Sequence, residues 1–433
     1  MGDTGTSWGG YPRASQRVSI LNDRDAPLPP FEGRALPYGN GRSYGDSCLN
    51  DGGTLLHAAG LDRYIRFDEA TGVLECEAGL SLAEIVAGML PRGWFLPVTP
   101  GTQHVTVGGA IANDVHGKNH HHHGSFGEHV LELELLRSDG SRRVCGPGQE
   151  PEWFAATLGG LGLTGVVTRA RLQLRRVPGP WVQATTRRFA DLGEFFALSE
   201  ATSADEYSVA WVDCLASGKQ LGRGVFTHAN HVAATATARP ARPRLAFPFT
   251  PPFSLVNPLS LRLFNQLYYR RSPAVPRTSV GHFAPFFYPL DAIGHWNRMY
   301  GPRGLLQYQC VVPPEVAAPA ISEILQRIAS HGSGSFLAVL KKFGSRRSAG
   351  MLSFPRPGTT LALDFPNRGA TTLRLLDELD RVVMQARGAV YPAKDARMSA
   401  AMFAVSFPRL PEFLPYVDPR FSSGLWRRVM VSG

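Results

Sequence analysis

Residues 108–124 read GGAIANDVHGKNHHHHG, so a glycine pair and a run of small side chains lead directly into histidines and a lysine. Small residues let backbone approach a large flat ligand, and the histidines can then stand over its reactive face. A metal site or an expression tag would also account for a run of histidines. A tag is disfavoured because the run lies inside the chain and not at a terminus.

Two more glycine-rich segments accompany this stretch: YGNGRSYGDS at 38–47 and LGGLGLTGVV at 158–167. Glycine permits positive φ, so successive backbone N–H groups can cradle a pyrophosphate. Each segment alone is weak evidence, because Gly-x-Gly occurs in many ordinary turns. GLGLTG at 160–165 precedes an alternating strand where a Rossmann fingerprint needs a helix, and the phosphate lysine of a P-loop is absent. The segments make more sense together, as walls of one cleft.

Composition places the chain among globular proteins. It has 433 residues, which suggests two or three domains, with 43% hydrophobic and 18% charged residues. The five cysteines are widely spaced and contain no Cys-x-x-Cys pair, so neither a disulfide framework nor a zinc knuckle is supported. A reduced compartment fits this usage. The first residues lack the pattern of a signal peptide, and no run of 18 apolar residues occurs, so we expect a cytoplasmic protein.

A net charge of +10 indicates a surface that attracts phosphates. Nucleic acid is disfavoured, because there is no zinc-finger spacing, ribonucleoprotein signature or long basic tail. Arginines bracket the Pro/Phe-rich stretch at 245–261, which cannot be a spanning helix because it carries four prolines. We therefore expect residues 240–271 to form a basic loop that either contacts a membrane surface at its inner face or is simply solvated. The bracketing residues are Arg244, Arg262, Arg270 and Arg271.

Local patterns predict strands and helices in alternation. Ser81 and Glu84 form a capping box that opens a helix ending near Leu90. In VVTRARLQLRRV, from 166, small or apolar residues alternate with Arg169, Arg171 and Arg175, as a half-buried strand requires. Pro-Gly-Pro at 178–180 is a plausible boundary. The other expected elements are hairpins at 64–78 and 131–146, strands within 206–216 and 304–313, and helices at 152–159 and 317–330. The last 45 residues are too short for a domain, so we expect them to pack on another part of the chain.

Seven motifs, in order along the chain, resemble one family. They are GNGRSYGD, LPVTPGTQHVTVGGAIANDVHGKNHH, GSFGEHV, GLGLTG, PLDAIGHWNRMYGPRGLLQYQ, LDFP and YPAKDAR. The chain resembles the flavoprotein oxidoreductases of the vanillyl-alcohol-oxidase superfamily and, within it, the decaprenylphosphoryl-ribose oxidase family. The resemblance implies an α+β fold. A PCMH-type FAD-binding domain at 1–178 would be completed by the C-terminal segment 389–433, with an α+β substrate domain inserted at 179–388.

The resemblance also implies which residues hold FAD. The first glycine loop should take the pyrophosphate, and 113–116 should line the isoalloxazine ring. Relatives that attach FAD covalently use a histidine in the first glycine loop, where this chain has Arg42, so the FAD is expected to be non-covalent. The implied cofactor residues are Pro37, Tyr38, Gly39, Asn40, Gly41, Arg42, Ser43, Tyr44, Gly45, Asp46, Ser47, Gly101, Thr106, Val107, Gly108, Gly109, Asn113, Asp114, Val115, His116, Val167 and Tyr391.

Lys394 and His116 are the implied catalytic residues. Oxidation of a sugar hydroxyl moves a hydride to flavin N5 and releases a proton, and lysine and histidine can supply positive charge and proton acceptance. The bland alternatives are a surface salt bridge between Lys394 and Asp395, and an ordinary core histidine at 116. The implied substrate pocket comprises Tyr44, Lys118, Trp211, Gln307, Gln309, Lys341 and Lys394.

Some features lie outside the family pattern. The family pattern accounts for His120 and His121 but leaves His122 and His123 unexplained. His116 and His120 have the i, i+4 spacing of metal ligands, yet no carboxylate or cysteine cluster completes a site, so we expect no metal. Thr360, Ala362 and Phe287 replace the asparagine, cysteine and tyrosine of the mycobacterial enzymes, which leaves the sugar's identity open. The helix expected before the first glycine loop is shortened to DRDAPLPPFEG.

The function that the resemblance implies is oxidation of the 2′-hydroxyl of a polyprenyl-phosphate-linked pentose, such as decaprenylphosphoryl-ribose, to the keto sugar. A short-chain reductase partner would then complete an epimerisation that serves cell-wall arabinan synthesis. Two alternatives stay open: an FAD-dependent oxidase of a free alditol, sugar or aldonolactone, and a non-catalytic flavin- or lipid-binding protein. The sequence names neither the electron acceptor nor the oligomeric state.

Overall fold

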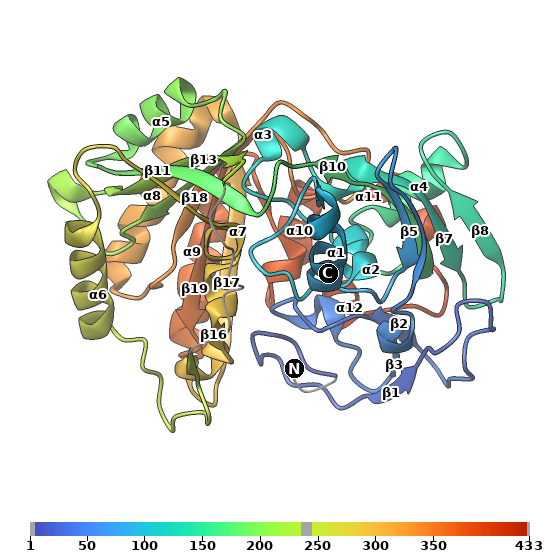
Figure 1. The fold of residues 1–433 in the computed structure, drawn as a ribbon. Helices are drawn as coiled ribbons and strands as arrows, with labels where there is room; N and C mark the ends of the chain where they lie inside the picture. The colour runs from blue at the N-terminus through green and yellow to red at the C-terminus, as the bar shows by residue number, and fades with distance from the viewer. Residues whose placement is uncertain (1–4, 235–244, 431–433) are drawn as a thin grey trace.

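Two large β-sheets lie on opposite sides of the molecule (Figure 1). The computed structural model describes residues 5–234 and 245–430. One sheet has five strands in the order β4-β5-β9-β7-β8, and every neighbouring pair is antiparallel. Its strands are β4 (Tyr64–Asp68), β5 (Val73–Glu77), β7 (Val130–Leu136), β8 (Arg142–Cys145) and β9 (Val166–Gln173). Both predicted hairpins are therefore confirmed.

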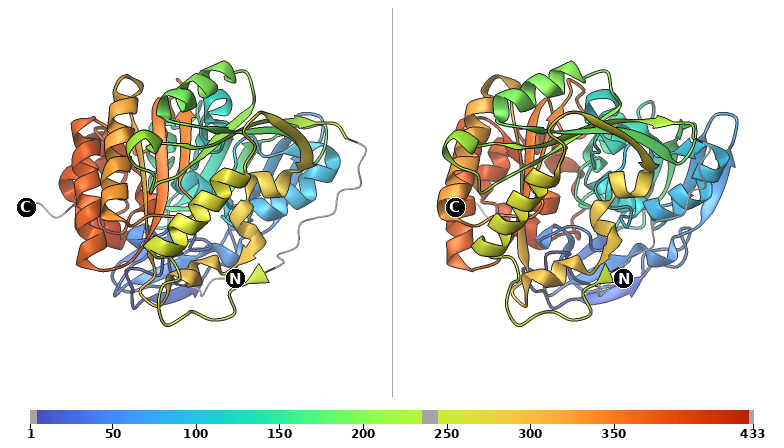
Figure 2. Two further views of the ribbon diagram at one scale, coloured as in Figure 1. Left: turned by 90° about the vertical axis from the view of Figure 1, so that its left-hand side faces the viewer. Right: turned by 60° about the vertical axis from the view of Figure 1, so that its left-hand side comes forward.

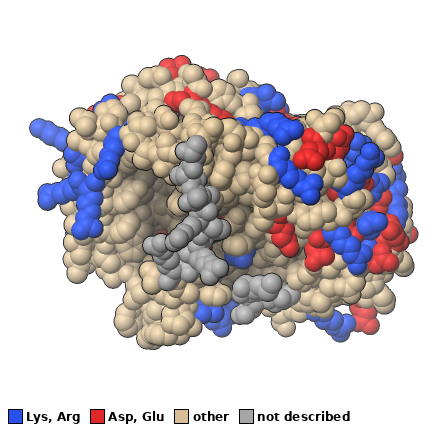
Figure 3. All heavy atoms as spheres, viewed as in Figure 1, with Lys and Arg blue, Asp and Glu red and all other residues tan. Residues whose placement is uncertain are grey.

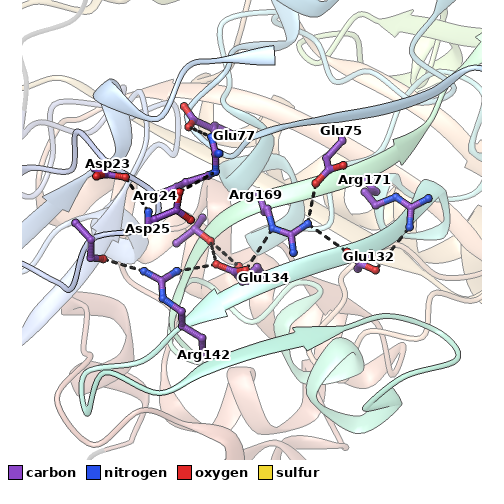
Figure 4. Close-up of polar contacts among 12 residues, drawn as sticks. Asp23, Arg24, Asp25, Glu75, Glu77, Glu132, Glu134, Arg142, Arg169 and Arg171 are labelled. Carbon is purple, nitrogen blue, oxygen red and sulfur yellow. Dashed lines mark hydrogen bonds and ion pairs between the residues drawn. The ribbon is translucent and has the colours of Figure 1, made fainter. Parts of the chain in front are cut away.

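Alternation along β9 puts its apolar side chains in the core and its arginines on the outer face, as predicted. Arg169 lies at the centre of an ion-pair network on that face (Figure 4). Its guanidinium is 2.7 Å from Glu75, 3.4 Å from Glu132 and 3.3 Å from Glu134, which stand on the two flanking strands. Cross-strand pairs of opposite charge favour this strand order over alternatives.

A small parallel sheet delivers the first glycine loop. It has the order β1-β3-β2, with β1 (Arg17–Ile20), β2 (Ala35–Tyr38) and β3 (Thr54–His57). The glycine loop begins where β2 ends. Helix α1 (Leu82–Met89) opens with the predicted capping box, in which Ser81 accepts from the Glu84 N–H and Glu84 accepts from the Ser81 N–H. Helix α2 (Val107–Ala112) follows and is capped by Thr106. Residues 23–33 form no helix.

The second sheet has eight strands, in the order β15-β11-β13-β12-β18-β19-β17-β20. Helices α5 (Leu192–Ala201), α8 (Ala317–His331) and α9 (Ala370–Gln385) cover its outer face (Figures 1 and 2). The strands are β11 (Trp181–Phe189), β12 (Tyr207–Val212), β13 (Gly224–Val232), β15 (Arg277–His282), β17 (Leu305–Val312), β18 (Val339–Phe343), β19 (Gly358–Pro366) and β20 (Ala389–Val390). Alternate residues of β17, such as Leu306 and Tyr308, join the core beneath the helices. The residues between them face the other way, toward the five-stranded sheet.

The C-terminal residues contact the eight-stranded sheet and the small parallel sheet. β20 pairs with β17, and Phe421 forms a bridge with Ala35 beside the small parallel sheet. Arg428, in helix α12 (Gly424–Val429), forms ion pairs with Asp46 and Asp395. The tail therefore packs back on the rest of the chain, as expected from its length. The proposed domain boundaries at 178 and 388 remain a prediction.

The expectation of a loop throughout 240–271 is wrong. Residues 258–271 form helix α6 (Pro258–Arg271), because Asn257 accepts hydrogen bonds from two first-turn N–H groups and proline is tolerated at the first helical position. The sequence between 245 and 257 contains only the short strand β14 (Leu245–Ala246). Arg244, one of the arginines that bracket this stretch, lies outside the described residues. No helix in the described part of the chain is long and apolar enough to span a membrane.

Candidate functional site

A cavity of about 1060 Å³ lies between the two sheets, and all three glycine-rich segments contribute to its wall. The eight-stranded sheet turns its inner face toward this cavity, and residues 285–296 close another side. The surface is hollowed between the two halves of the molecule (Figure 3). The three segments are thus walls of one cleft, as the sequence predicted.

Most of the predicted cofactor residues line this cavity. They are Pro37, Tyr38, Gly39, Asn40, Gly41, Arg42, Ser43, Tyr44, Ser47, Gly101, Thr106, Gly108, Gly109, Asn113, Val115, His116, Val167 and Tyr391. Four do not line it, so for these residues a direct contact with FAD remains a prediction. Gly45 packs so closely on the tail that an added Cβ would lie 1.9 Å from the Asp395 carbonyl oxygen, and Asp46 is paired with Arg428. Val107 is fully buried in the apolar core.

Asp114 is the fourth of these residues. Its carboxylate accepts hydrogen bonds from the Gly127 N–H, at 2.8 Å, and from the Ser353 hydroxyl. It is fully buried and has a positive φ of 39°. Asp114 therefore shapes the turn that carries Asn113 and Val115 into the cavity wall, and it does not face the cavity itself.

The first glycine loop has the shape and donors that a pyrophosphate needs. A Cβ on Gly39 would lie 2.4 Å from the Thr106 hydroxyl, and Gly41 has φ +59° with the Tyr38 hydroxyl 2.1 Å from its Cβ position. Larger residues at either position would fill the cradle. Among the described residues, Arg42 Nε and Ser47 Oγ are buried without a protein partner. Unsatisfied buried donors beside a glycine cradle suit a bound anionic group. The residues present therefore fit FAD.

Tyr391 supports the wall on which the flavin ring is predicted to rest. Its hydroxyl donates to the Asn113 carbonyl oxygen at 2.9 Å, and its ring stacks on Phe354 with centroids 4.6 Å apart. This contact joins the C-terminal tail to the segment 113–116, and the two bonded residues are 278 positions apart in the sequence. The predicted return of Tyr391 to the cavity is therefore seen in the fold.

Lys394 faces the cavity, and its expected alternative role is wrong. Its Nζ lies 4.0 Å from the centroid of the Tyr44 ring. Asp395 does not pair with it: that carboxylate accepts the N–H groups of Arg397 and Met398, and it contacts Arg428. Burial lowers the pKa of Lys394 to about 8.

Asp364 is a cavity residue that the motif reasoning missed. It is 3% exposed, and one carboxylate oxygen accepts from Gln307 Nε2 at 2.6 Å. Burial raises the pKa of Asp364 to about 6, opposed by the positive charge of Lys394, and the negative charge of Asp364 raises that of Lys394 in return. The signal was present in LDFP, because strand alternation from Thr360 through Ala362 brings Asp364 to the same face.

His116 lies among polar partners. Its Nε2 is 2.8 Å from the Gln309 side-chain nitrogen, and its Nδ1 is 3.3 Å from Lys341 Nζ. Gln309 also donates to the Thr360 hydroxyl, at 3.1 Å. Burial, followed by the charge of Lys341, holds the pKa of His116 well below its ordinary value, so the imidazole is neutral at neutral pH. His116 therefore differs from an ordinary core histidine, because it lies at the cavity wall and both ring nitrogens have polar neighbours. Its ring still packs on Phe343, with ring centroids 4.8 Å apart.

The remaining predicted substrate residues line the same cavity: Tyr44, Lys118, Trp211, Gln307, Gln309 and Lys341. Trp211 is oriented by donation from Nε1 to the Phe336 carbonyl oxygen and by an edge contact with Tyr268 of α6. Burial lowers the pKa of Lys118 to about 8. Burial and the charges of Lys118 and Lys394 lower that of Lys341 to about 7. The charges of the three ammonium groups therefore interact across the cavity.

The histidine run forms the one-turn helix α3 (His120–His123) outside this cavity. His120 packs on Phe343 at 4.4 Å and accepts from the Gly344 N–H, so it shares an aromatic neighbour with His116 and not a ligand. His122 is exposed, and His123 lies 3.7 Å from Glu206. Across residues 5–234 and 245–430, no group of three His, Cys, Asp or Glu could hold a metal ion. These contacts make His123 part of a charged cluster and leave His122 without a role.

The sequence of this chain is similar to those of known FAD-binding and oxidase proteins. A family model described as an FAD binding domain matches residues 31–146. The chain is 38% identical over 413 residues to decaprenylphosphoryl-β-D-ribose oxidase of Mycolicibacterium smegmatis, covering 92% of this chain and 89% of that protein. It is also 38% identical to an uncharacterised protein of Streptomyces coelicolor, over 80% of this chain and 98% of the relative. Similarity to cytokinin dehydrogenase 8 of Oryza sativa subsp. indica is 35% over 121 residues, 27% of this chain and 23% of that protein.

Proposed function

Since the chain belongs to the decaprenylphosphoryl-β-D-ribose oxidase family of FAD-dependent oxidoreductases, we propose that it oxidises a secondary hydroxyl of a polyprenyl-phosphate-linked pentose to a ketone. The observation that carries this proposal is the placement of Lys394 and the His116–Lys341 pair on one cavity whose glycine loop fits FAD. The corresponding hydroxyl is the 2′-OH when the pentose is ribose.

When bound, FAD supplies the two-electron acceptor for this oxidation. The protein residues hold the sugar and manage the proton. Gln307 and Gln309 offer amide groups that can bind sugar hydroxyls. His116, kept neutral by burial and oriented by Gln309 and Lys341, can accept the hydroxyl proton. Lys394 provides a fixed positive charge where negative charge develops, and Tyr44 beneath it limits its movement.

The test is anaerobic mixing of the FAD-loaded protein with a lipid-linked ribose and, separately, with free polyols. Bleaching of the visible flavin band by the lipid-linked ribose at micromolar concentration supports the proposal. Bleaching by free alditols or aldonolactones alone would favour the alternative of a small-substrate oxidase. A flavin that no alcohol reduces would support a non-catalytic flavin- or lipid-binding protein.

Helix α6 supports a further part of the proposal, contact with a membrane surface that holds the lipid substrate. Leu259, Leu263 and Leu267, spaced by four residues, are 77%, 61% and 44% exposed. Phe249 and Phe253 nearby are each 67% exposed. Five large apolar side chains exposed along one short part of the chain are unusual on a protein that faces only water.

Basic residues accompany this apolar surface. Arg262, Arg270 and Arg271 of α6 are exposed, and Lys and Arg side chains gather at the edge of the molecule that α6 occupies (Figure 3). Leucines flanked by arginines suit the interface of an anionic bilayer. Phe264 and Tyr268 of the same helix line the cavity, so a lipid tail could pass from the bilayer along α6. A short-chain reductase that reduces the keto sugar to the opposite epimer is the further partner that we propose.

A further inference from the structure

The cavity face of the eight-stranded sheet begins with polar side chains at one edge. Gln307 and Gln309 stand on β17, and Asp364 stands beside Gln307 on β19, where the two strands are in register. Lys341 faces the cavity from β18, the next strand across, opposite Thr360. Carboxylate and amide groups therefore give way to an ammonium group over about 5 Å, the spacing of adjacent strands.

Beyond β18 the same face becomes apolar. Val209 and Trp211 face the cavity from β12, and Val225 does so from β13, where it is paired with Trp211. Phe264 of α6 lies over this region and contacts Phe336 with ring centroids 4.9 Å apart. Across the sheet, the cavity face therefore changes from groups that can bind sugar hydroxyls, on β17 and β19, to the amino group on β18. It then becomes an apolar wall on β12 and β13.

Lys118 stands at the boundary between the two regions from the opposite wall. Its carbonyl oxygen accepts from the N–H of Ser208 at 2.9 Å, which fixes its backbone at the start of β12. Its Nζ donates to the Phe287 carbonyl oxygen at 3.0 Å and lies 5.5 Å from the Phe286 ring centroid. Lys341 Nζ donates to the carbonyl oxygen of the adjacent Gly117, at 3.2 Å. The side chain of Lys341 therefore reaches the backbone beside Lys118, and the two lysines lie near one another in the cavity.

An ammonium group has three donors, and the Phe287 carbonyl takes only one from Lys118. Neither Lys118 nor Lys341 forms an ion pair with a carboxylate among the described residues. The two aspartates that line the cavity lie elsewhere: Asp364 binds Gln307, and Asp291 accepts from the Gln103 N–H. Two enclosed lysine amino groups at a polar–apolar boundary are suited to a phosphate that joins a sugar to an isoprenoid, because the negative charge of the phosphate favours their protonated forms.

We propose that Lys118 and Lys341 form the phosphate subsite, with the pentose over β17 and β19 and the first isoprene units over β12 and β13 beneath α6. The inference rests on the proposed function and assigns its specificity for a lipid phosphate to named residues. Lys118 is the selective element, because it touches neither His116 nor Lys394 in the structure, whereas Lys341 also orients His116.

The experiment measures binding without turnover. FAD-loaded protein is titrated with farnesyl phosphate and with farnesol, and perturbation of the flavin absorbance reports occupancy. We expect the wild type to prefer the phosphate, and Lys118→Met, which keeps the side-chain volume, to lose roughly ten- to a hundredfold of that preference. Lys118→Arg should retain it within a few-fold. The matched control is Lys342→Met, because Lys342 is the next residue on β18 but pairs with Glu200 at 2.6 Å on the other side.

A Lys118→Met protein with full FAD occupancy and an unchanged preference for farnesyl phosphate would overturn the inference. Kinetics give an independent readout. With lipid-linked ribose, Lys118→Met should raise the concentration for half-maximal flavin reduction by at least tenfold and change the saturating rate by less than about threefold. If the wild type prefers farnesyl phosphate but no lipid-linked pentose reduces its flavin, the proposed function fails while the phosphate subsite stands.

Discussion

At the scale of single residues, Lys394 is the cavity charge whose surroundings indicate its role most clearly. Lys394 lies over Tyr44 and opposite Asp364, and its sequence neighbour Asp395 is already satisfied by backbone N–H groups. An unpaired ammonium directed into a cavity is costly to bury unless it serves a bound ligand. Its effect should therefore appear in catalysis more than in folding.

Lys394→Ala should leave FAD bound, because the glycine loop is a separate element, and should slow flavin reduction roughly 10²- to 10³-fold. Lys394→Arg should not restore the rate, because a planar guanidinium differs in shape from an ammonium. The measurement is the anaerobic reduction rate at saturating substrate together with FAD occupancy, with the exposed Lys342→Ala as control. A near-normal rate with full FAD occupancy would remove Lys394 from the active site.

Asp364→Asn should change the pH dependence of the same rate. The carboxylate raises the pKa of Lys394, so its removal lets burial lower that pKa further below about 8. The ammonium is then lost at lower pH, and the fall in rate on the alkaline side should begin earlier. Asp291→Asn is the control, because Asp291 lines the cavity but acts on Arg42 and His104. Identical alkaline limbs for wild type and Asp364→Asn would show that the two groups are not linked.

At the scale of elements, the first glycine loop shows why backbone conformation limits the cofactor site. Gly41→Ala adds a methyl group 2.1 Å from the Tyr38 hydroxyl and 2.4 Å from the Thr6 carbonyl oxygen, at φ +59°. The loop must move, so the purified variant should contain much less FAD. Gly52→Ala is the matched control, because Gly52 has φ +74° but its Cβ would meet nothing within 4 Å. Equal flavin content in both variants would contradict the cradle.

Helix α6 is the element whose exposed face we expect to bind membranes. Leu259→Ser with Leu263→Ser should reduce co-sedimentation with anionic vesicles several-fold, because two exposed apolar anchors are lost. Reduction of the flavin by a short-chain substrate should be unaffected. Leu414→Ser removes a leucine that is 42% exposed in another region and provides the control. Sedimentation that is unchanged by the double substitution would exclude α6 as the contact.

At the scale of the whole molecule, the cavity exists only where distant segments meet. The glycine loop, the segment 100–118, the inner face of the eight-stranded sheet and the C-terminal tail each supply one wall. Ion pairs of Arg428 with Asp46 and Asp395 hold the tail against the glycine loop. We therefore expect these tertiary contacts to hold FAD without a covalent bond.

Acid or heat should accordingly release all of the flavin into the supernatant. Arg42 stacks on Trp8 at 4.5 Å and cannot form the bond that a histidine makes in covalent relatives. The measurement is the flavin absorbance of the supernatant and of the precipitated protein. Colour retained by the precipitate would show a covalent attachment elsewhere.

Chelators should leave activity unchanged, and a loss that zinc restores would revive the histidine cluster as a metal site.

The sequence alone predicted the features that depend on local rules and on motifs. Capping at Ser81, alternation along β9 and both hairpins follow from hydrogen bonding and side-chain period within a few residues. The FAD cleft followed from the glycine segments taken together with the family resemblance. Helix α6 was missed because Pro248, Pro251 and Pro252 lie just before it and its exposed leucines obscured the helical period. Asn257 and Pro258 were nevertheless suitable for a helix start.

Only the tertiary structure decided which charges meet. Lys394 and Asp364 are 30 residues apart in sequence, and Lys118 and Lys341 are more than 200 apart, so no local pattern relates them. The same packing places Gly45, Asp46, Val107 and Asp114 behind the cavity wall, where Gly45 and Val107 are closely packed and the carboxylates of Asp46 and Asp114 have protein partners. Burial sets the pKa of a lysine through everything packed around it, and that environment is created only when the two sheets close on one cavity.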